Sequence, residues 1–338
     1  MSRPSDAMGW SDGSDVDLPV EGHLPPLDGA TGWLNSEPLN PEGLRGRVVA
    51  ANFCTYTCIN WIRTLPYIRA WAERYADQGL VMLGVHTPEF SVEKDVGNIR
   101  RALSQMKVEH PIAIDSDYAV WEAFANRYWP ALYLIDAEGR IRHHWFGEGD
   151  YERSERAIQR LLSEATGAPP AKDLVSVAPL PPEVEADWDD LRSGETYVGY
   201  GRTEHFRSPG GQAPDEPQVY AVPETLGRNE WALAGDWTVR GEGAVSNAPN
   251  GRIAFRFHAR DVHLVMGPVA GRSSPFRVSI DGQPPGDAAG SDVDADGVGT
   301  FDIPRMYQLI RQPSPTEDRR FEIEFPDAGA EAFVFTFG

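Results

Sequence analysis

The sequence predicts two domains in series, an α/β domain followed by an all-β sandwich of the jelly-roll type. Strand-like apolar runs alternate with amphipathic, helix-like segments up to residue 165, which is typical of an α/β sheet with parallel strands. Short strand-like runs with little helix between them recur after residue 191, as in a sandwich. Residues 166–185 contain five prolines and no clear period, which is typical of a linker. The predicted boundaries are 1–20 (acidic and disordered), 21–165 (the α/β domain), 166–190 (the linker) and 191–338 (the sandwich).

The first domain begins with a loop-rich lead-in at residues 21–47 and then follows the order β-α-β-α-β-α-β-β-α. The short apolar run at 47–53 predicts a buried strand. Apolar side chains at helical spacing predict a helix over 64–78, which Gly79 ends. The remaining predicted elements are strands at 80–86, 111–117, 131–136 and 141–147, and helices at 92–107, 118–126 and 151–165.

The second domain shows a run of short strands. Turn signals such as Asn250-Gly251 and Asp281-Gly282 separate several of them. The predicted strands are 237–240, 252–259, 262–266, 276–280, 299–303, 308–311, 320–325 and 332–337.

Charge and hydropathy narrow the function classes. The 338-residue chain carries a formal net charge of −20, which disfavours a nucleic-acid partner or an anionic membrane surface. It has no run of the roughly 18 apolar residues that span a bilayer, and its N-terminus lacks the apolar core of a signal peptide. We therefore expect a cytoplasmic protein without a membrane segment, or an exported one if the chain is a fragment of a longer protein.

Both cysteines of the chain lie in the stretch NFCTYTCINWIRTLPY, at Cys54 and Cys58. Two cysteines in one five-residue window indicate redox or metal chemistry rather than a disulfide scaffold. Thiol–disulfide turns usually carry a second cysteine three residues after the first, as C-x-x-C, but here that position holds Trp61. The sequence predicts no cofactor and no metal site.

Residues 45–162 resemble a thioredoxin-fold domain of the TlpA/ResA type. The resemblance rests on the strand VVAANF, the turn FCTYTCINW, the helix after it, and the dipeptide Trp129-Pro130 before ALYLID. The stretch CINWIRTLPYIRAWAERYADQGLVMLGVHTPEF further resembles the thioredoxin-like region of DipZ-type proteins. The part after residue 195 resembles their C-terminal β-domain, which looks like a carbohydrate-binding module. The resemblance implies an α/β thioredoxin fold followed by an all-β sandwich, and a thiol–disulfide oxidoreductase.

The family pattern F-W-A-x-W-C-x-x-C can be matched to this chain residue by residue. Phe53 matches the first residue and Cys58 the nucleophile, whereas Cys54 falls where a tryptophan usually stands. Trp61 takes the place of the resolving cysteine. Pro130 matches the proline that, in this fold, follows a cis bond and faces the active-site cysteine.

Cys58 is the expected nucleophile. It should lie at a helix N-terminus, where partial positive charge and unpaired N–H groups favour a thiolate. Cys54 has two interpretations. Four extended residues span up to about 13 Å, so a Cys54–Cys58 disulfide, a C-x-x-x-C pair, requires the turn to fold back. Alternatively, Cys54 is a buried thiol that fills part of the missing tryptophan's volume. Trp61 can pack over the turn, and a mixed disulfide at Cys58 would then need Cys54, a second protein or a small thiol.

His86 and Glu89 follow the second predicted strand, and ligands gather at such strand ends in α/β folds. An imidazole or carboxylate near Cys58 can move its proton, and a capping or loop role is the alternative. Arg63 can pair with a substrate anion or face solvent, and we favour solvent.

Three functions remain open. Thiol–disulfide exchange at Cys58, with Cys54 as a non-standard resolving thiol, is the leading hypothesis. The second is a peroxiredoxin-like peroxidase that uses Cys58 alone, because Thr55 and Cys58 match T-x-x-C, although Ala51 stands where that pattern has proline. The third is a redox-inactive binding protein. The expected partners are a protein or small-molecule thiol or disulfide and an unidentified electron donor, with a homodimer possible.

The second domain offers two candidate binding features. SDVDADGVG at 291–299 resembles the start of a calcium loop, but Ile303 stands where the twelfth-position glutamate belongs. A polar turn is the favoured interpretation and a calcium site the alternative. Aromatic residues could stack on a sugar, although we favour a core role for them; they are Tyr197, Tyr200, Trp231 and Trp237.

Overall fold

The computed structural model describes residues 18–269 and 271–338, and the chain divides into two compact units between Glu183 and Val184. Residues 1–17 of the segment predicted to be disordered lie outside the described residues. Leu18, the first described residue, is buried against the first unit. Among the described residues, no helix has the length and apolar character that crossing a membrane requires.

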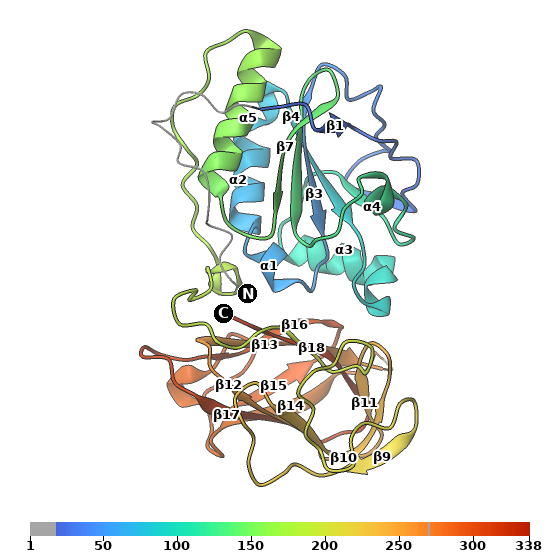
Figure 1. Cartoon of the computed structure of the whole chain (residues 1–338), viewed down its shortest axis with the longest axis vertical. Coiled ribbons are helices and arrows are strands. Elements are labelled where there is room, and N and C mark those ends of the chain that lie inside the picture. Colours follow the sequence, from blue (N-terminus) through green and yellow to red (C-terminus); the bar gives the residue numbers. More distant parts are fainter. Residues whose placement is uncertain (1–17, 270) are drawn as a thin grey trace. The chain divides into compact units, whose positions relative to one another are not determined.

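In the part of the first unit that the structure describes, a mixed sheet of seven strands has the order β1-β7-β6-β3-β4-β5-β2 (Figure 1). Strand β3 pairs in parallel with β4 and antiparallel with β6, so it lies at the centre of the sheet. Strands β1 and β2 come from the lead-in, which was predicted to be a loop, and they pair with β7 and β5 at the two edges. The strands are β1 (Gly22–His23), β2 (Gly32–Leu34), β3 (Val48–Cys54), β4 (Leu80–His86), β5 (Ile112–Ile114), β6 (Ala131–Ile135) and β7 (Arg140–Phe146).

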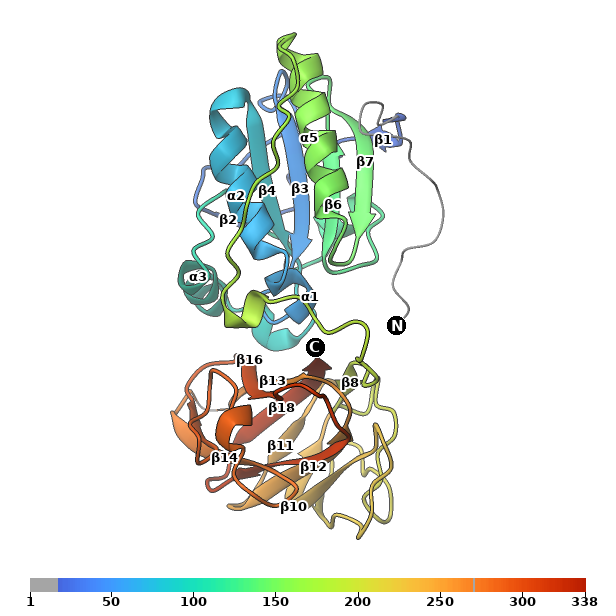
Figure 2. The same cartoon turned by 90° about the vertical axis from the view of Figure 1, so that its left-hand side faces the viewer.

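Helices cover both faces of this sheet. The α-helices are α1 (Ile59–Ile62), α2 (Leu65–Tyr75), α3 (Val96–Gln105), α4 (Ala119–Ala123) and α5 (Tyr151–Thr166), and the 3₁₀ helices are η1 (Ala76–Gln78), η2 (Ser91–Lys94) and η3 (Pro181–Glu183). Helices α2 and α5 lie together on one face of the sheet (Figure 2), and α4 lies on the other (Figure 1). The helix predicted over 92–107 is interrupted, because the carboxylate of Asp95 caps α3 by accepting from Asn98 N–H at 2.8 Å.

The alternation of side chains along β3 positions the cysteine turn. Val48 and Ala50 face α2 and α5, whereas Val49, Ala51 and Phe53 pack in the core on the α4 side. By the same two-residue period, the side chains of positions 52 and 54 lie on the α2 face. The turn that follows β3 therefore lies on the α2 side of the sheet and leads into α1.

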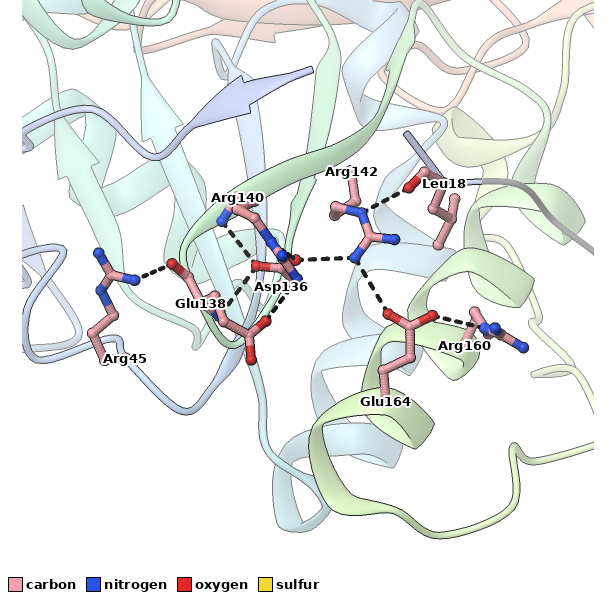
Figure 3. A network of polar contacts seen from close by, with 8 residues as sticks. All are labelled: Leu18, Arg45, Asp136, Glu138, Arg140, Arg142, Arg160 and Glu164. Carbon is pink, nitrogen blue, oxygen red and sulfur yellow. Dashed lines mark hydrogen bonds and ion pairs between the residues drawn. The ribbon is translucent and has the colours of Figure 1, made fainter. Parts of the chain in front are cut away.

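An ionic network fixes the β6–β7 turn (Figure 3). Asp136 accepts from the guanidinium groups of Arg140 at 2.7 Å and Arg142 at 3.0 Å. Although burial raises the pKa of Asp136, these hydrogen bonds hold it below its ordinary value. Arg142 also donates to the carbonyl of Leu18 and to Glu164 on α5. The network thereby joins the turn, the last part of α5 and the first described residue (Figure 3).

The proline-rich segment after α5 is bound to the first unit. The carboxylate of Glu155, inside α5, accepts from Val175 N–H at 2.9 and 3.1 Å. Gln159 donates to the carbonyl of Asp173, and Arg69 on α2 pairs with Glu183 at 2.7 Å. Residues 173–183 therefore form a strap along α2 and α5.

The described residues of the second unit form an antiparallel β-sandwich of eleven strands. The strands are β8 (Thr196–Tyr197), β9 (Pro217–Tyr220), β10 (Trp231–Val239), β11 (Ala244–Ser246), β12 (Gly251–Phe257), β13 (Asp261–Pro268), β14 (Ser274–Ile280), β15 (Val298–Phe301), β16 (Arg305–Arg311), β17 (Arg319–Phe325) and β18 (Ala330–Phe337), with one 3₁₀ turn, η4 (Gly286–Ala288). Strand β10 takes part in both layers, since its first half pairs with β12 and its second half with β9 and β11. The change falls at Gly235, whose φ of 91° disfavours a side chain.

The candidate binding residues of the second unit make contacts within that unit. Trp231 and Trp237 are fully buried, which confirms their predicted core role. The core role predicted for Tyr200 is wrong, because its side chain is exposed and donates to Asp215 at 2.8 Å. In the acidic turn, Asp292 accepts from Arg305 and Gln308 N–H, and Asp294 accepts from Val298 N–H, as in the favoured polar turn; these contacts occupy both carboxylates.

Candidate active site

Cys58 is half-buried at the N-terminal cap of α1. Its N–H donates to the carbonyl of Thr55 at 3.2 Å, which closes the turn after β3. Its own backbone is extended, with φ −73° and ψ 112°, and its carbonyl accepts from Ile62 N–H at 2.9 Å. The thiol therefore sits at a helix start, as predicted.

The helix behind Cys58 is kinked rather than ended. Arg63 and Thr64 keep right-handed helical angles between α1 and α2. Pro66, in the first turn of α2, has no N–H to offer the carbonyl of Ile62, which accounts for the break. The helical stretch therefore runs from just after Cys58 to Tyr75 with one interruption.

The loop before β6 lies beside the thiol. The Trp129–Pro130 bond is cis, as the resemblance implied, and the Cys58 thiol donates to the carbonyl of Trp129 at 3.9 Å. The Pro130 carbonyl accepts from Gly147 N–H at 2.8 Å, and the Trp129 indole donates to the carbonyl of Thr87 at 3.0 Å. The sheet thus holds Pro130 next to Cys58.

Cys54 ends β3 as a fully buried thiol. It donates to the carbonyl of Val85 at 3.4 Å, and the structure holds both cysteines as thiols rather than as a Cys54–Cys58 disulfide. Burial raises the pKa of the Cys54 thiol, and the charge of Glu93 raises it further. This geometry matches the volume-filling interpretation of Cys54.

Trp61 fills the position of the missing resolving cysteine. Its side chain is 1% exposed, and its indole N–H donates to Asn52 Oδ1 at 2.8 Å. Asn52, on β3, donates in turn to the carbonyl of Ala131 at 3.3 Å. The indole is thus built into the core beneath the turn, and sequence reasoning missed its Asn52 partner.

His86 is buried behind the turn. Its Nε2 accepts from Tyr56 N–H at 3.3 Å, and its ring stacks on that of Tyr56 with centroids 5.7 Å apart. Burial lowers the pKa of His86 to about 4, so the imidazole is neutral at pH 7.

Glu93, rather than Glu89, supplies the buried carboxylate next to the turn. Glu89 is half-buried, and its backbone N–H donates to Glu93. Glu93 is fully buried on η2 and accepts from the hydroxyl of Thr57, which immediately precedes Cys58. Sequence reasoning missed Glu93 because it fell within a predicted amphipathic helix, where a glutamate is usually solvated; the Asp95 cap two residues later was the available signal.

The prediction that Arg63 faces solvent is wrong. Its side chain is 2% exposed and pairs with Glu148 at 3.0 Å. Glu148 lies in the loop between β7 and α5, next to Gly147. This buried ion pair ties the helix start to the loop that carries the hydrogen bond to Pro130.

The described residues contain no group of three or more histidine, cysteine, aspartate or glutamate side chains placed to hold a metal ion. The reactive candidate is the half-exposed Cys58 thiol, which lies at a helix start beside a cis proline and next to a buried polar layer that includes His86 and Glu93.

Comparisons with known proteins identify the family of this chain. The protein YkuV of Bacillus subtilis, named a thiol-disulfide oxidoreductase, is 30% identical over 141 residues that cover 42% of this chain and 95% of YkuV. The chain belongs to the thioredoxin-like family. A solved thioredoxin-like protein in its oxidised form is also 30% identical, covers 43% of this chain and 97% of its own, and superposes with a TM-score of 0.40.

The match to a second relative covers more of this chain. The DipZ protein of Mycobacterium tuberculosis is 36% identical over 343 residues, which cover 97% of this chain. The chain spans 44% of the length of DipZ. Residues 193–338, the β-sandwich, match the family model described as a thioredoxin-like C-terminal domain.

Proposed function

We propose that the first unit catalyses thiol–disulfide exchange through Cys58. The observation that carries this proposal is the position of the thiol, half-exposed at the start of α1 and directed to the carbonyl before cis Pro130. The helix start favours the thiolate, and the cis-proline loop offers a backbone edge beside it. The membership of the thioredoxin-like family supports the same chemistry.

The proposed step is a displacement at sulfur. The Cys58 thiolate attacks one sulfur of a substrate disulfide, and a new bond joins that sulfur to Cys58. The substrate bond breaks, and the second sulfur leaves with the electron pair and takes a proton from solvent. A protein or small-molecule disulfide is the expected substrate, and no cofactor is needed.

The proposal also concerns which thiol resolves the mixed disulfide at Cys58. Resolution by Cys54 through a C-x-x-x-C disulfide would require this buried thiol to break its hydrogen bond with Val85 and to ionise in an apolar setting. A thiolate from solvent or from a second protein meets neither obstacle. We therefore propose that an external thiol resolves the mixed disulfide at Cys58 and that this thiol is the electron donor.

Intact mass and peptide mapping after treatment with oxidised glutathione test the proposal. We expect one glutathione adduct on Cys58 and an unmodified Cys54. The loss of two hydrogens mapped to the two cysteines would replace the external thiol with Cys54 as the resolving group. No modification of Cys58 would refute the exchange function.

A parallel treatment with hydrogen peroxide separates the peroxidase hypothesis. That function requires Cys58 to form a sulfenic acid with peroxide faster than it forms a mixed disulfide with glutathione disulfide. The exchange function predicts the reverse order of rates. If neither reagent modifies Cys58, a redox-inactive binding protein is the remaining function.

A further inference from the structure

The carboxyl group of Glu93 joins two segments of the candidate site. One oxygen accepts from the hydroxyl of Thr57, and the other accepts from the N–H groups of Glu89 at 2.5 Å and Phe90 at 2.8 Å. Thr57 belongs to the turn after β3, and its neighbour in the chain is Cys58. The three donors leave this buried carboxylate well satisfied when it is ionised.

Other contacts join the same two segments. Thr87 N–H donates to the carbonyl of Cys54 at 3.0 Å. The backbone N–H of Tyr56 donates to His86, and its hydroxyl donates to the carbonyl of Val92 at 3.4 Å. The loop after β4 therefore supports the cysteine turn along residues 54–57, and Glu93 makes the last of these contacts before the nucleophile.

Protonation of Glu93 changes what its partners can do. Burial raises the pKa of this carboxyl to about 7, against the lowering effect of the hydrogen bonds from Thr57 and Phe90. The protonated acid has one O–H to donate, and two of its three partners are N–H groups that cannot accept it. Of these three donors, only the Thr57 hydroxyl can also accept that proton, and to do so it must reverse its direction. The Thr55 hydroxyl, which also lowers the pKa of Glu93, is the other acceptor close to the carboxyl group.

We propose that Glu93 is a positioning residue for Cys58, which holds the nucleophile's turn through Thr57 and sets by its own ionisation the pH at which the Cys58 thiol becomes reactive. This inference rests on the proposed exchange function. Ionised Glu93 places a negative charge one residue away from the nucleophile and so opposes thiolate formation. Protonated Glu93 removes that opposition.

Glu93 titrates near neutral pH, whereas the buried titratable groups next to it do not. Burial lowers the pKa of His86 to about 4 and raises the pKa values of Cys54 and Tyr56, so these three groups remain neutral there. The other titratable or charged groups on the elements around this cluster include Cys58, Glu89, Lys94, Asp95, Arg100 and Arg101.

The pH profile of Cys58 alkylation tests the proposal. The rate of iodoacetamide reaction would be measured on the full chain between about pH 5 and 9, with peptide mapping to separate Cys58 from Cys54. Glu93→Gln keeps the shape of the protonated acid and its donor to Thr57, so the turn should stay in place. We expect its profile to lie roughly 0.5–1 pH unit below that of the wild type. Glu73→Gln, an exposed change on α2, is the matched control and should leave the profile in place.

Two changes at Thr57 keep the proposal falsifiable if Glu93→Gln fails to fold. Thr57→Ser keeps the hydroxyl donor, so the wild-type profile should be retained. Thr57→Val removes it, which disfavours ionised Glu93 and should therefore move the profile to lower pH, toward that of Glu93→Gln. Superimposable profiles for the wild type, Glu93→Gln and Thr57→Val would overturn the inference while leaving the exchange function intact. A wild-type Cys58 that is unreactive at every pH would instead refute the exchange function.

Discussion

Trp61 stands where a second thiol would complete a C-x-x-C pair, and its side chain is packed and hydrogen-bonded within the core. The buried indole has its N–H satisfied by Asn52, which itself is anchored to β6. A large, hydrogen-bonded side chain at this position makes Cys58 a single-thiol site unless the turn rearranges. The residue that replaces the resolving cysteine is therefore part of the packed core and does not lie on the surface of the turn.

Trp61→Cys should restore a dithiol couple at a cost in stability. The introduced thiol lies three residues from Cys58 at a helix start, the spacing at which C-x-x-C disulfides form. Emptying the indole's site and leaving Asn52 without its donor should lower the free energy of unfolding by roughly 3–5 kcal/mol. Intact mass in a dithiothreitol redox titration and urea unfolding would measure both effects. A variant as stable as the wild type, or one that forms no disulfide, would contradict this view of Trp61.

Glu93 also makes a pH-dependent contribution to stability. Its pKa is about 7 in the folded chain against an ordinary value of 4.5, so the folded state binds this proton more tightly. The contribution is fully present below about pH 4.5 and is lost as pH rises through about 7. Relative to Glu93→Gln, the wild type should lose on the order of 3 kcal/mol across that window. Urea unfolding of both proteins as a function of pH measures the difference, and a constant difference would show that Glu93 does not titrate there.

At the scale of elements, one buried carboxylate makes a central contact with the strap at residues 173–183. Glu155 accepts from Trp71, Tyr75 and the backbone of Val175. Glu155→Ala removes the acceptor of all three groups and should cost roughly 2–4 kcal/mol. The strap should then exchange its amide hydrogens faster than in the wild type.

A matched control for this variant lies on the same helix. Glu164→Ala removes only partly exposed ion pairs with Arg142 and Arg160, so about 1 kcal/mol or less is expected, with no change in the strap (Figure 3). Equal hydrogen exchange in the strap for both variants would show that Glu155 does not hold it.

The elements predicted best are those whose apolar pattern is long. The strand expected at 47–53 is β3 at Val48–Cys54, and the one expected at 80–86 is β4 with the same bounds. Strands β1 and β2 were missed because two or three residues carry no period, and their pairing with β7 and β5 is tertiary. The break before α3 was missed because the apolar spacing continues through Asp95. In the structure, the Asp95 side chain caps the N-terminus of α3 and so separates it from η2.

The candidate site was predictable only where a residue type carried the chemistry by itself. Cys58 and Pro130 could be identified from the motif and from the position before a strand. Glu93 and Asn52 could not, since their roles come from partners that are distant in the sequence or hidden in a turn. Burial of Arg63 was likewise missed, because its partner Glu148 lies 85 residues away in the chain.

At the scale of the molecule, acid should destabilise the first unit. Burial lowers the pKa values of His86, His110 and His143 to about 4, so their stabilising contribution is present above the ordinary value of 6.5 and is lost as pH falls toward 4. From about pH 7 to 5.5 each histidine should cost on the order of 1 kcal/mol, whereas Glu93 gains about as much as one of them loses. The three histidines therefore outweigh the one glutamate.

The helical circular dichroism signal isolates this effect, since the described α-helices all belong to the first unit. Its urea midpoint should fall between about pH 7 and 5.5. A midpoint that rises over this interval would contradict the assignment of neutral, buried histidines.

The central claim is that Cys58 alone carries exchange chemistry. The most direct measurement is the rate at which the full chain accelerates thiol exchange between a glutathionylated peptide and reduced glutathione, compared for the wild type, Cys54→Ser and Cys58→Ser. We expect acceleration by the wild type and by Cys54→Ser, and the uncatalysed rate for Cys58→Ser. A Cys58→Ser variant as fast as the wild type, or a Cys54→Ser variant as slow as no protein, would contradict it.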